Sequence, residues 1–68
     1  MTVVKIIELI GSSNISWEDA AKNALKEARK TVRNIVGMDV LKFSAKIKDG
    51  EIIEYRANVK IAFIVERP

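Results

Sequence analysis

The sequence contains neither cysteine nor histidine among its 68 residues. Without cysteine, neither a disulfide nor a thiolate metal site is available to stabilise the fold. Without histidine, the commonest general base and the commonest transition-metal ligand are both missing, which argues against a metalloenzyme and against a serine–histidine hydrolase. A chain this short has a thin core, so association with further copies is the remaining usual source of stability.

The sequence also lacks a long hydrophobic run and a strong charge of one sign. Its apolar first eleven residues are interrupted by Lys5 and Glu8, follow no basic segment, and are too few to cross a bilayer. The net charge is +3, and acidic and basic residues are interspersed, which favours a mixed solvated surface over a nucleic-acid-binding one. We therefore expect a soluble, cytoplasmic protein that binds neither nucleic acid nor membrane.

The apolar pattern predicts a single domain over residues 1–68 that starts with a strand and a helix. Residues 2–10 are rich in β-branched side chains, which is typical of a strand, and residues 11–14 are expected to form a loop. Ser16 is placed to cap a helix. Apolar residues then recur at helical spacing as far as Ile35, which predicts one amphipathic helix of about five turns.

Two further strands are predicted after the helix. Gly37 is interpreted as the residue that ends the helix and opens the turn into the second strand. Apolar and polar residues alternate over 41–48 and again over 53–65, and Asp49-Gly50 between them is a strong hairpin signal. A plain two-residue turn would place Phe43 opposite Arg56, an apolar side chain beside a polar one. We therefore expect a three-residue loop or a β-bulge.

The predicted fold class is α+β, in the order β-α-β-β, with a three-stranded antiparallel sheet packed on one long helix. One helix covers only one face of a sheet, yet the strands carry apolar residues on both faces. Burying each such side chain is worth about 1.5–3 kcal/mol, so a second copy of the chain is expected to cover the other face. The residues concerned are Val4, Ile6 and Ile10 against Val3, Ile7 and Leu9 in the first strand, and Met38 and Val40 against Leu41 and Phe43 in the second.

Four stretches in the same order are similar to those of a known family. They are V-V-K-I-I-E-L-I-G-S-S, S-W-E-D-A-A, A-R-K-T-V-R-N-I and D-G-E-I-I-E-Y-R-A-N-V-K-I-A-F. Together they span about residues 3–66, and over this range the chain resembles the dodecin family. The resemblance implies a dodecin-like β-α-β-β subunit that assembles into a hollow homododecamer. It further implies a non-catalytic protein that stores or sequesters flavins, bound in pairs between subunits.

The resemblance also indicates where a flavin site would lie. The family's flavin-stacking tryptophan matches Gly37, and the glutamine that follows the tyrosine of the last strand matches Arg56. Basic residues that contact a flavin phosphate in some members match Ser44 and Ile64. Gly37 offers no aromatic surface, and arginine can only donate hydrogen bonds where glutamine both donates and accepts. The usual stacked flavin pair is therefore not expected in its usual geometry.

Two interpretations of the basic strand residues stay open. Arg56 with Lys42, Lys46 and Lys60 could form a surface for an anionic ligand such as FMN, FAD or coenzyme A, with riboflavin as a further flavin candidate. Alternatively, these side chains face solvent or form salt bridges between subunits. Their acidic partners would then be Glu8, Glu51 and Glu54. The candidate ligand-binding residues are Gly37, Lys42, Ser44 and Arg56.

A calcium-binding or purely structural shell is the alternative function. One branch of dodecin-like proteins lacks the tryptophan, carries Tyr-Arg and is associated with calcium, and Tyr55-Arg56 matches that branch. Calcium requires several oxygen ligands, and no EF-hand spacing is present. Asp39 and Glu54 are the metal-ligand candidates, provided that symmetry brings copies together. Trp17 is expected in the core, because it lies on the apolar stripe of the predicted helix.

Overall fold

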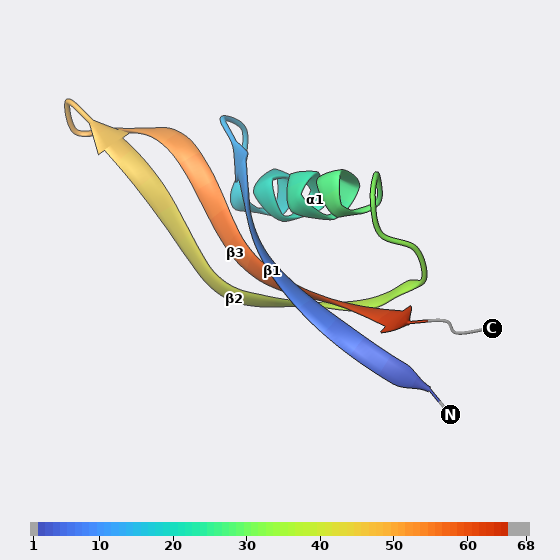
Figure 1. The fold of residues 1–68 in the computed structure, drawn as a ribbon. Helices are drawn as coiled ribbons and strands as arrows, with labels where there is room; N and C mark the ends of the chain where they lie inside the picture. Colours follow the sequence, from blue (N-terminus) through green and yellow to red (C-terminus); the bar gives the residue numbers. More distant parts are fainter. Residues whose placement is uncertain (1, 66–68) are drawn as a thin grey trace.

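The computed structural model describes residues 2–65. Its elements are β1 (Val3–Ser13), α1 (Trp17–Ala28), β2 (Ile35–Lys48) and β3 (Glu51–Val65). The strands form one antiparallel sheet in the order β1-β3-β2, and α1 lies on one face of it (Figure 1). The predicted β-α-β-β order and three-stranded antiparallel sheet are confirmed.

The helix begins where predicted but is shorter. The Asp19 N–H donates to Ser16 Oγ at 3.0 Å, which caps the first turn. α1 ends at Ala28, seven residues before the predicted end at Ile35. Apolar residues continue at helical spacing beyond Ala28 because Ile35, at the start of β2, packs against the same core. The prediction of a five-turn helix is therefore wrong.

Gly37 does not end the helix. It lies inside β2 opposite Ala62, and the residue with a left-handed backbone conformation between α1 and β2 is Asn34, with φ of 61°. Asparagine tolerates this conformation better than most residues do. The Ile64 N–H donates to the Asn34 carbonyl at 3.0 Å, which attaches the end of this loop to β3.

β1 continues through Gly11, Ser12 and Ser13, which the sequence predicted to be a loop. These three residues lie opposite Ala57, Arg56 and Tyr55 of β3. A glycine is required here by packing rather than by a turn. A Cβ at Gly11 would lie 2.1 Å from the Ala20 carbonyl oxygen and 2.8 Å from the Ala24 Cβ, so α1 crosses β1 almost in backbone contact.

The β2–β3 hairpin resolves the mismatch that its sequence raises. The turn is the two residues Asp49 and Gly50, both with positive φ. The pairing register then shifts between Lys46 and Ile47, because Lys46 lies opposite Glu54 and Ile47 opposite Ile52. Phe43 consequently lies opposite Ala57 instead of Arg56. The expected bulge is confirmed.

A second register shift changes which face the side chains of β2 occupy. It falls between Val40 and Lys42, so Val40 lies opposite Val59 while Phe43 lies opposite Ala57. Val59 and Ala57 are both buried on the helix side of the sheet. Val40 and Phe43 therefore share one face, and the prediction that Met38 and Val40 lie opposite Phe43 is wrong.

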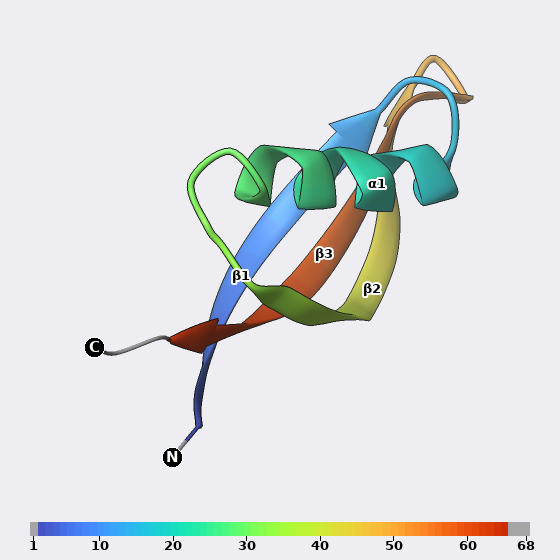
Figure 2. The same cartoon turned by 90° about the vertical axis from the view of Figure 1, so that its right-hand side faces the viewer.

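The core lies between α1 and the sheet, and it is thin. α1 crosses the strands obliquely (Figure 2), and its inner side consists largely of alanines, which allow the helix to lie close to β1 and β3. The β2–β3 hairpin extends beyond the helix (Figure 1). None of the described helices is long and apolar enough to cross a membrane. The buried apolar residues are Ala20, Ala21, Ala24, Ala28, Ala57, Val59 and Ile61.

Candidate ligand-binding face of the sheet

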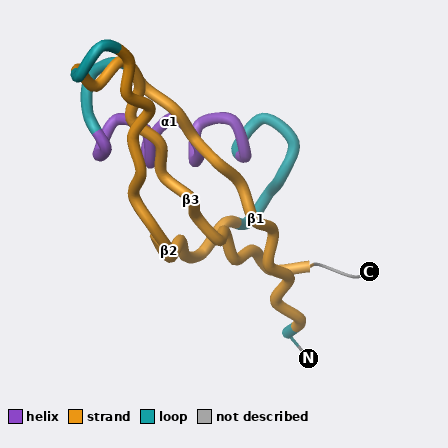
Figure 3. Tube along the Cα trace, turned by 90° about the vertical axis from the view of Figure 1, so that its left-hand side faces the viewer, coloured by secondary structure: helices purple, strands orange, loops and turns teal. Residues whose placement is uncertain are grey.

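The face of the sheet that α1 does not cover carries all the candidate site residues, and we call it the outer face. β3 lies in the middle of the sheet (Figure 3), so each outer-face residue of β3 has one neighbour on β1 and one on β2. Four such rows follow from the pairing register. From the hairpin toward the chain ends they are Ser12–Arg56–Ser44, Ile10–Asn58–Lys42, Glu8–Lys60–Asp39 and Ile6–Ala62–Gly37.

Three of the candidate ligand residues lie close together. Ser44 is directly opposite Arg56, and Lys42 is in the next row on the same face. The Arg56 Nε–H donates to Glu54 Oε2 at 2.5 Å, so Arg56 forms an ion pair with Glu54 within one chain, whereas the salt bridge expected from the sequence was between subunits. Both side chains are partly exposed, so this pair contributes little to stability and leaves the guanidinium free to make further hydrogen bonds.

Asn58 lies between Lys42 and Ile10 and was not among the predicted site residues. Its Oδ1 is buried and has no hydrogen-bond partner within the described chain. Buried acceptors are normally satisfied, and one left unpaired costs about 1–3 kcal/mol. Its place two residues after Arg56 on the polar side of the last strand was visible in the sequence, but its burial was not.

Gly37 lies at the other, apolar end of the outer face. A Cβ there would touch only the Ala62 Cβ, at 4.0 Å, so the space beside this glycine is open. Gly37 is opposite Ala62, which is six residues along β3 from Arg56. At about 3.3 Å per residue this separation approaches 20 Å. One chain therefore does not place Gly37 and Arg56 against the same ring.

The two metal-ligand candidates are also apart. Asp39 lies opposite Lys60, whereas Glu54 lies opposite Lys46 and pairs with Arg56. Within residues 2–65 there is no group of three or more acidic side chains that could hold a metal ion. Calcium takes six to eight oxygen ligands, which these two separate carboxylates do not supply by themselves.

Trp17 lies at the edge of the helix-covered side and not in the core. Its side chain is 38% exposed, and its ring packs edge-on against Tyr55, with centroids 4.8 Å apart. Its Nε1–H donates to the Ser44 carbonyl at 2.7 Å. The predicted core position is wrong, because the core is filled by the alanines of α1 and by β3. Trp17 instead joins the start of the helix to the β2–β3 hairpin.

Comparisons with known proteins agree with this architecture. The family model described as Dodecin matches residues 3–66, and the chain belongs to the dodecin family. It is 35% identical to the calcium dodecin of Mycobacterium tuberculosis over 93% of this chain and 89% of that protein. It is 33% identical to the dodecin of Thermus thermophilus over 94% and 93% of the two chains.

Solved structures of dodecins have the same fold. The tt0972 protein from Thermus thermophilus superposes with a TM-score of 0.94 at 31% identity, covering 100% of both chains. The calcium dodecin from Mycobacterium tuberculosis, described as calcium chelating with a novel calcium-binding site, gives a TM-score of 0.83 at 35% identity. That superposition covers 97% of this chain and 93% of the other.

Proposed function

We propose that this protein is a non-catalytic, homododecameric small-ligand binding or storage protein that takes a flavin or a related anionic nucleotide. The proposal rests chiefly on one observation, the neighbouring positions of Arg56, Ser44 and Lys42 on an uncovered face of the sheet. Guanidinium, hydroxyl and ammonium groups are suitable donors for phosphate oxygens or for the carbonyl edge of a flavin.

A complete site would require two copies of the chain. Gly37 and Arg56 lie too far apart on one chain for both to contact one ring. A two-fold axis between two outer faces would instead place the Gly37 end of each chain against the Arg56 end of the other, which gives two equivalent sites. This arrangement agrees with the exposed apolar side chains of Ile6 and Ile10, which a neighbouring copy would cover.

The ligand is expected to bind through its polar groups more than through stacking. The open space at Gly37 leaves room for a ring, but glycine provides no π-face. The loss of one stacking aromatic costs about 1–3 kcal/mol, or about fivefold to 150-fold in affinity. The orphaned Asn58 Oδ1 beside Lys42 could accept a hydrogen bond from such a ligand.

Titration of the assembled protein with riboflavin and with FMN, followed by flavin fluorescence, tests the proposal. We expect quenching by the unmodified protein. The double variant Gly37→Trp with Arg56→Gln is expected to bind riboflavin more tightly, by about tenfold or more, because the added ring stacks on the flavin and riboflavin has no phosphate for Arg56 to hold. The variant Lys22→Trp adds the same ring on the exposed side of α1 and is expected to leave the affinity unchanged. An assembled double variant that binds no flavin would contradict the proposed location of the site.

Calcium is the second candidate, because the calcium dodecin of Mycobacterium tuberculosis is 35% identical to this chain. In this protein the carboxylates of Glu8 and Asp39 flank Lys60 on the outer face, where a second copy could add ligands. Metal analysis and calcium titration of the same preparation distinguish the two functions. Calcium binding without flavin quenching would favour the second, and an assembled shell that binds neither ligand would be purely structural.

A further inference from the structure

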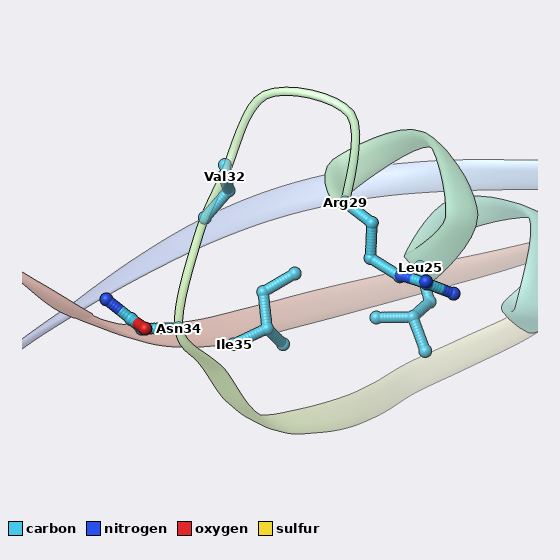
Figure 4. Close-up of a pocket in the computed structure, with 5 residues that line it drawn as sticks. All are labelled: Leu25, Arg29, Val32, Asn34 and Ile35. Atoms are coloured by element: carbon cyan, nitrogen blue, oxygen red, sulfur yellow. The ribbon is translucent and has the colours of Figure 1, made fainter.

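An open, groove-like cavity lies on the helix side of the sheet, away from the outer face. It has a volume of about 450 Å³ and lies between the C-terminal end of α1, the following loop and the start of β2. Leu25, Val32 and Ile35 form its apolar walls, and Arg29 and Asn34 are its polar residues. In Figure 4 the Ile35 side chain lies beneath the arch of the loop, and the Leu25 and Arg29 side chains lie side by side at the helix end.

Backbone hydrogen bonds fix both ends of the loop that borders the cavity. At the helix end, the N–H groups of Thr31 and Val32 both donate to the Ala28 carbonyl, at 3.2 and 2.9 Å. At the strand end, the Ile64 N–H donates to the Asn34 carbonyl at 3.0 Å. The loop is thus attached at both ends, and a ligand would not have to order it.

The surroundings of the cavity are positively charged. A second hollow beside it is lined by Lys26, Arg29 and Lys30, so Arg29 belongs to both. Lys30 pairs with Glu27, but no acidic partner lies within ion-pair distance of Lys26 or Arg29 among residues 2–65. The helix C-terminus contributes the equivalent of about half a negative charge, which two full positive charges outweigh.

We propose that this cavity binds an amphipathic organic anion, a compact aromatic or aliphatic group that carries a carboxylate, sulfonate or phosphate. The apolar body would occupy the space between Leu25, Val32 and Ile35, and the anionic group would lie against Arg29 with Lys26 nearby. The volume is within the range of about 300–1,000 Å³ that is usual for small-molecule sites. Its lining of three apolar and two polar residues suits a ligand that has both an apolar and a charged part.

Two fluorescent probes with related skeletons test the site in the assembled protein. 8-Anilinonaphthalene-1-sulfonate carries an anionic group, and N-phenyl-1-naphthylamine lacks it. We expect the sulfonate to bind more tightly, and Arg29→Gln to weaken the sulfonate by about five- to tenfold while changing the neutral probe little. Val32→Ser, in the loop wall, is expected to weaken both probes.

Two controls make the result specific to this cavity. Lys48→Gln removes a positive charge at the hairpin tip and is expected to leave both affinities unchanged, and light scattering checks that each variant keeps the mass of the unmodified protein. The proposal is overturned if the assembled protein binds no sulfonate probe, as it would if another copy filled the cavity. Equal affinities in the Arg29→Gln and Lys48→Gln variants would overturn it as well.

Discussion

Gly11 and Gly37 are both strand glycines, but their surroundings differ. At Gly11 an added Cβ would meet the backbone of α1, at 2.1 Å from the Ala20 oxygen and 2.8 Å from the Ala24 nitrogen. At Gly37 it would meet only the Ala62 Cβ, at an ordinary contact distance of 4.0 Å. The first glycine determines how closely the helix approaches the sheet, and the second leaves space on the outer face.

We predict that Gly11→Ala strongly destabilises the protein and that Gly37→Ala does not. The clash at Gly11 is with backbone atoms, which move only if α1 shifts away from β1, and such overpacking costs about 1–3 kcal/mol or more. Urea unfolding at equal protein concentrations should show the midpoint lowered for Gly11→Ala alone. Equal midpoints for the two variants would show that the helix does not lie against Gly11.

These two glycines show what local pattern can and cannot predict. The sequence indicated that Gly11 lies near a chain reversal, but the sequence alone does not distinguish a glycine in a loop from a glycine in a closely packed strand. The interpretation of Gly37 as a helix terminator failed for a similar reason, because Asn34 adopts the left-handed conformation. Asn34, and not Gly37, lies where the loop after α1 meets the sheet. Its carbonyl accepts a hydrogen bond from Ile64 of β3, a contact that the local sequence does not reveal.

At the scale of the elements, each strand of the β2–β3 hairpin has a bulge, and the bulge in β2 reverses the register shift that the bulge in β3 introduces. The register shift near Ile53 on β3 brings Phe43 opposite Ala57, and the shift near Leu41 on β2 then brings Val40 opposite Val59. Apolar residues of β2 therefore change from even to odd positions at Leu41 while staying on one face. The sequence correctly predicted the first bulge from the Phe43–Arg56 mismatch. It missed the second because a bulge and a two-faced strand give the same apolar pattern.

The start of α1 was predictable because its signal is local. Ser16 and Asp19 lie three residues apart, and that spacing alone allows the cap. The helix end was not predictable from the apolar repeat, since Val32 and Ile35 continue the repeat from a loop and a strand. A hydrophobic period identifies residues that face a common core, and it does not require that they belong to one helix.

We predict that Ser16→Ala destabilises the protein by about 1 kcal/mol, the usual cost of removing an N-cap. The lost contact is the hydrogen bond from the Asp19 N–H to Ser16 Oγ. Ser12→Ala is the matched control, because Ser12 is exposed and its side chain makes no hydrogen bond within residues 2–65. Urea unfolding should lower the midpoint for Ser16→Ala only. A comparable loss for Ser12→Ala would mean that the cap is not the cause.

At the scale of the whole molecule, a single chain leaves many of its large apolar side chains exposed. One helix of 12 residues covers a sheet whose strands reach 14 and 15 residues, so much of the sheet is left uncovered (Figure 1). Ile6 and Ile10 on the outer face remain 49% and 68% exposed. The sequence predicted this two-sided apolar character for the first strand, and the structure confirms it there. The same prediction fails in part for the second strand, because its bulge places Val40 on the helix side of the sheet, together with Phe43.

The outer face of β1 therefore provides the sharpest test of assembly. We predict that the unmodified protein is an oligomer and that Ile6→Lys with Ile10→Lys converts it to smaller species. Fully burying an exposed isoleucine contributes about 1.5–3 kcal/mol, and these two partly exposed side chains would gain part of that amount each. A lysine in either place would bring an unpaired charge into the interface. Light scattering should give a multiple of the 7.6 kDa chain mass for the unmodified protein and a lower mass for the double variant. Ile15→Lys is the control, because Ile15 is 72% exposed but lies in the loop between β1 and α1. If the double variant keeps the mass of the unmodified protein while Ile15→Lys loses it, the copies associate through the loop and not through the outer face.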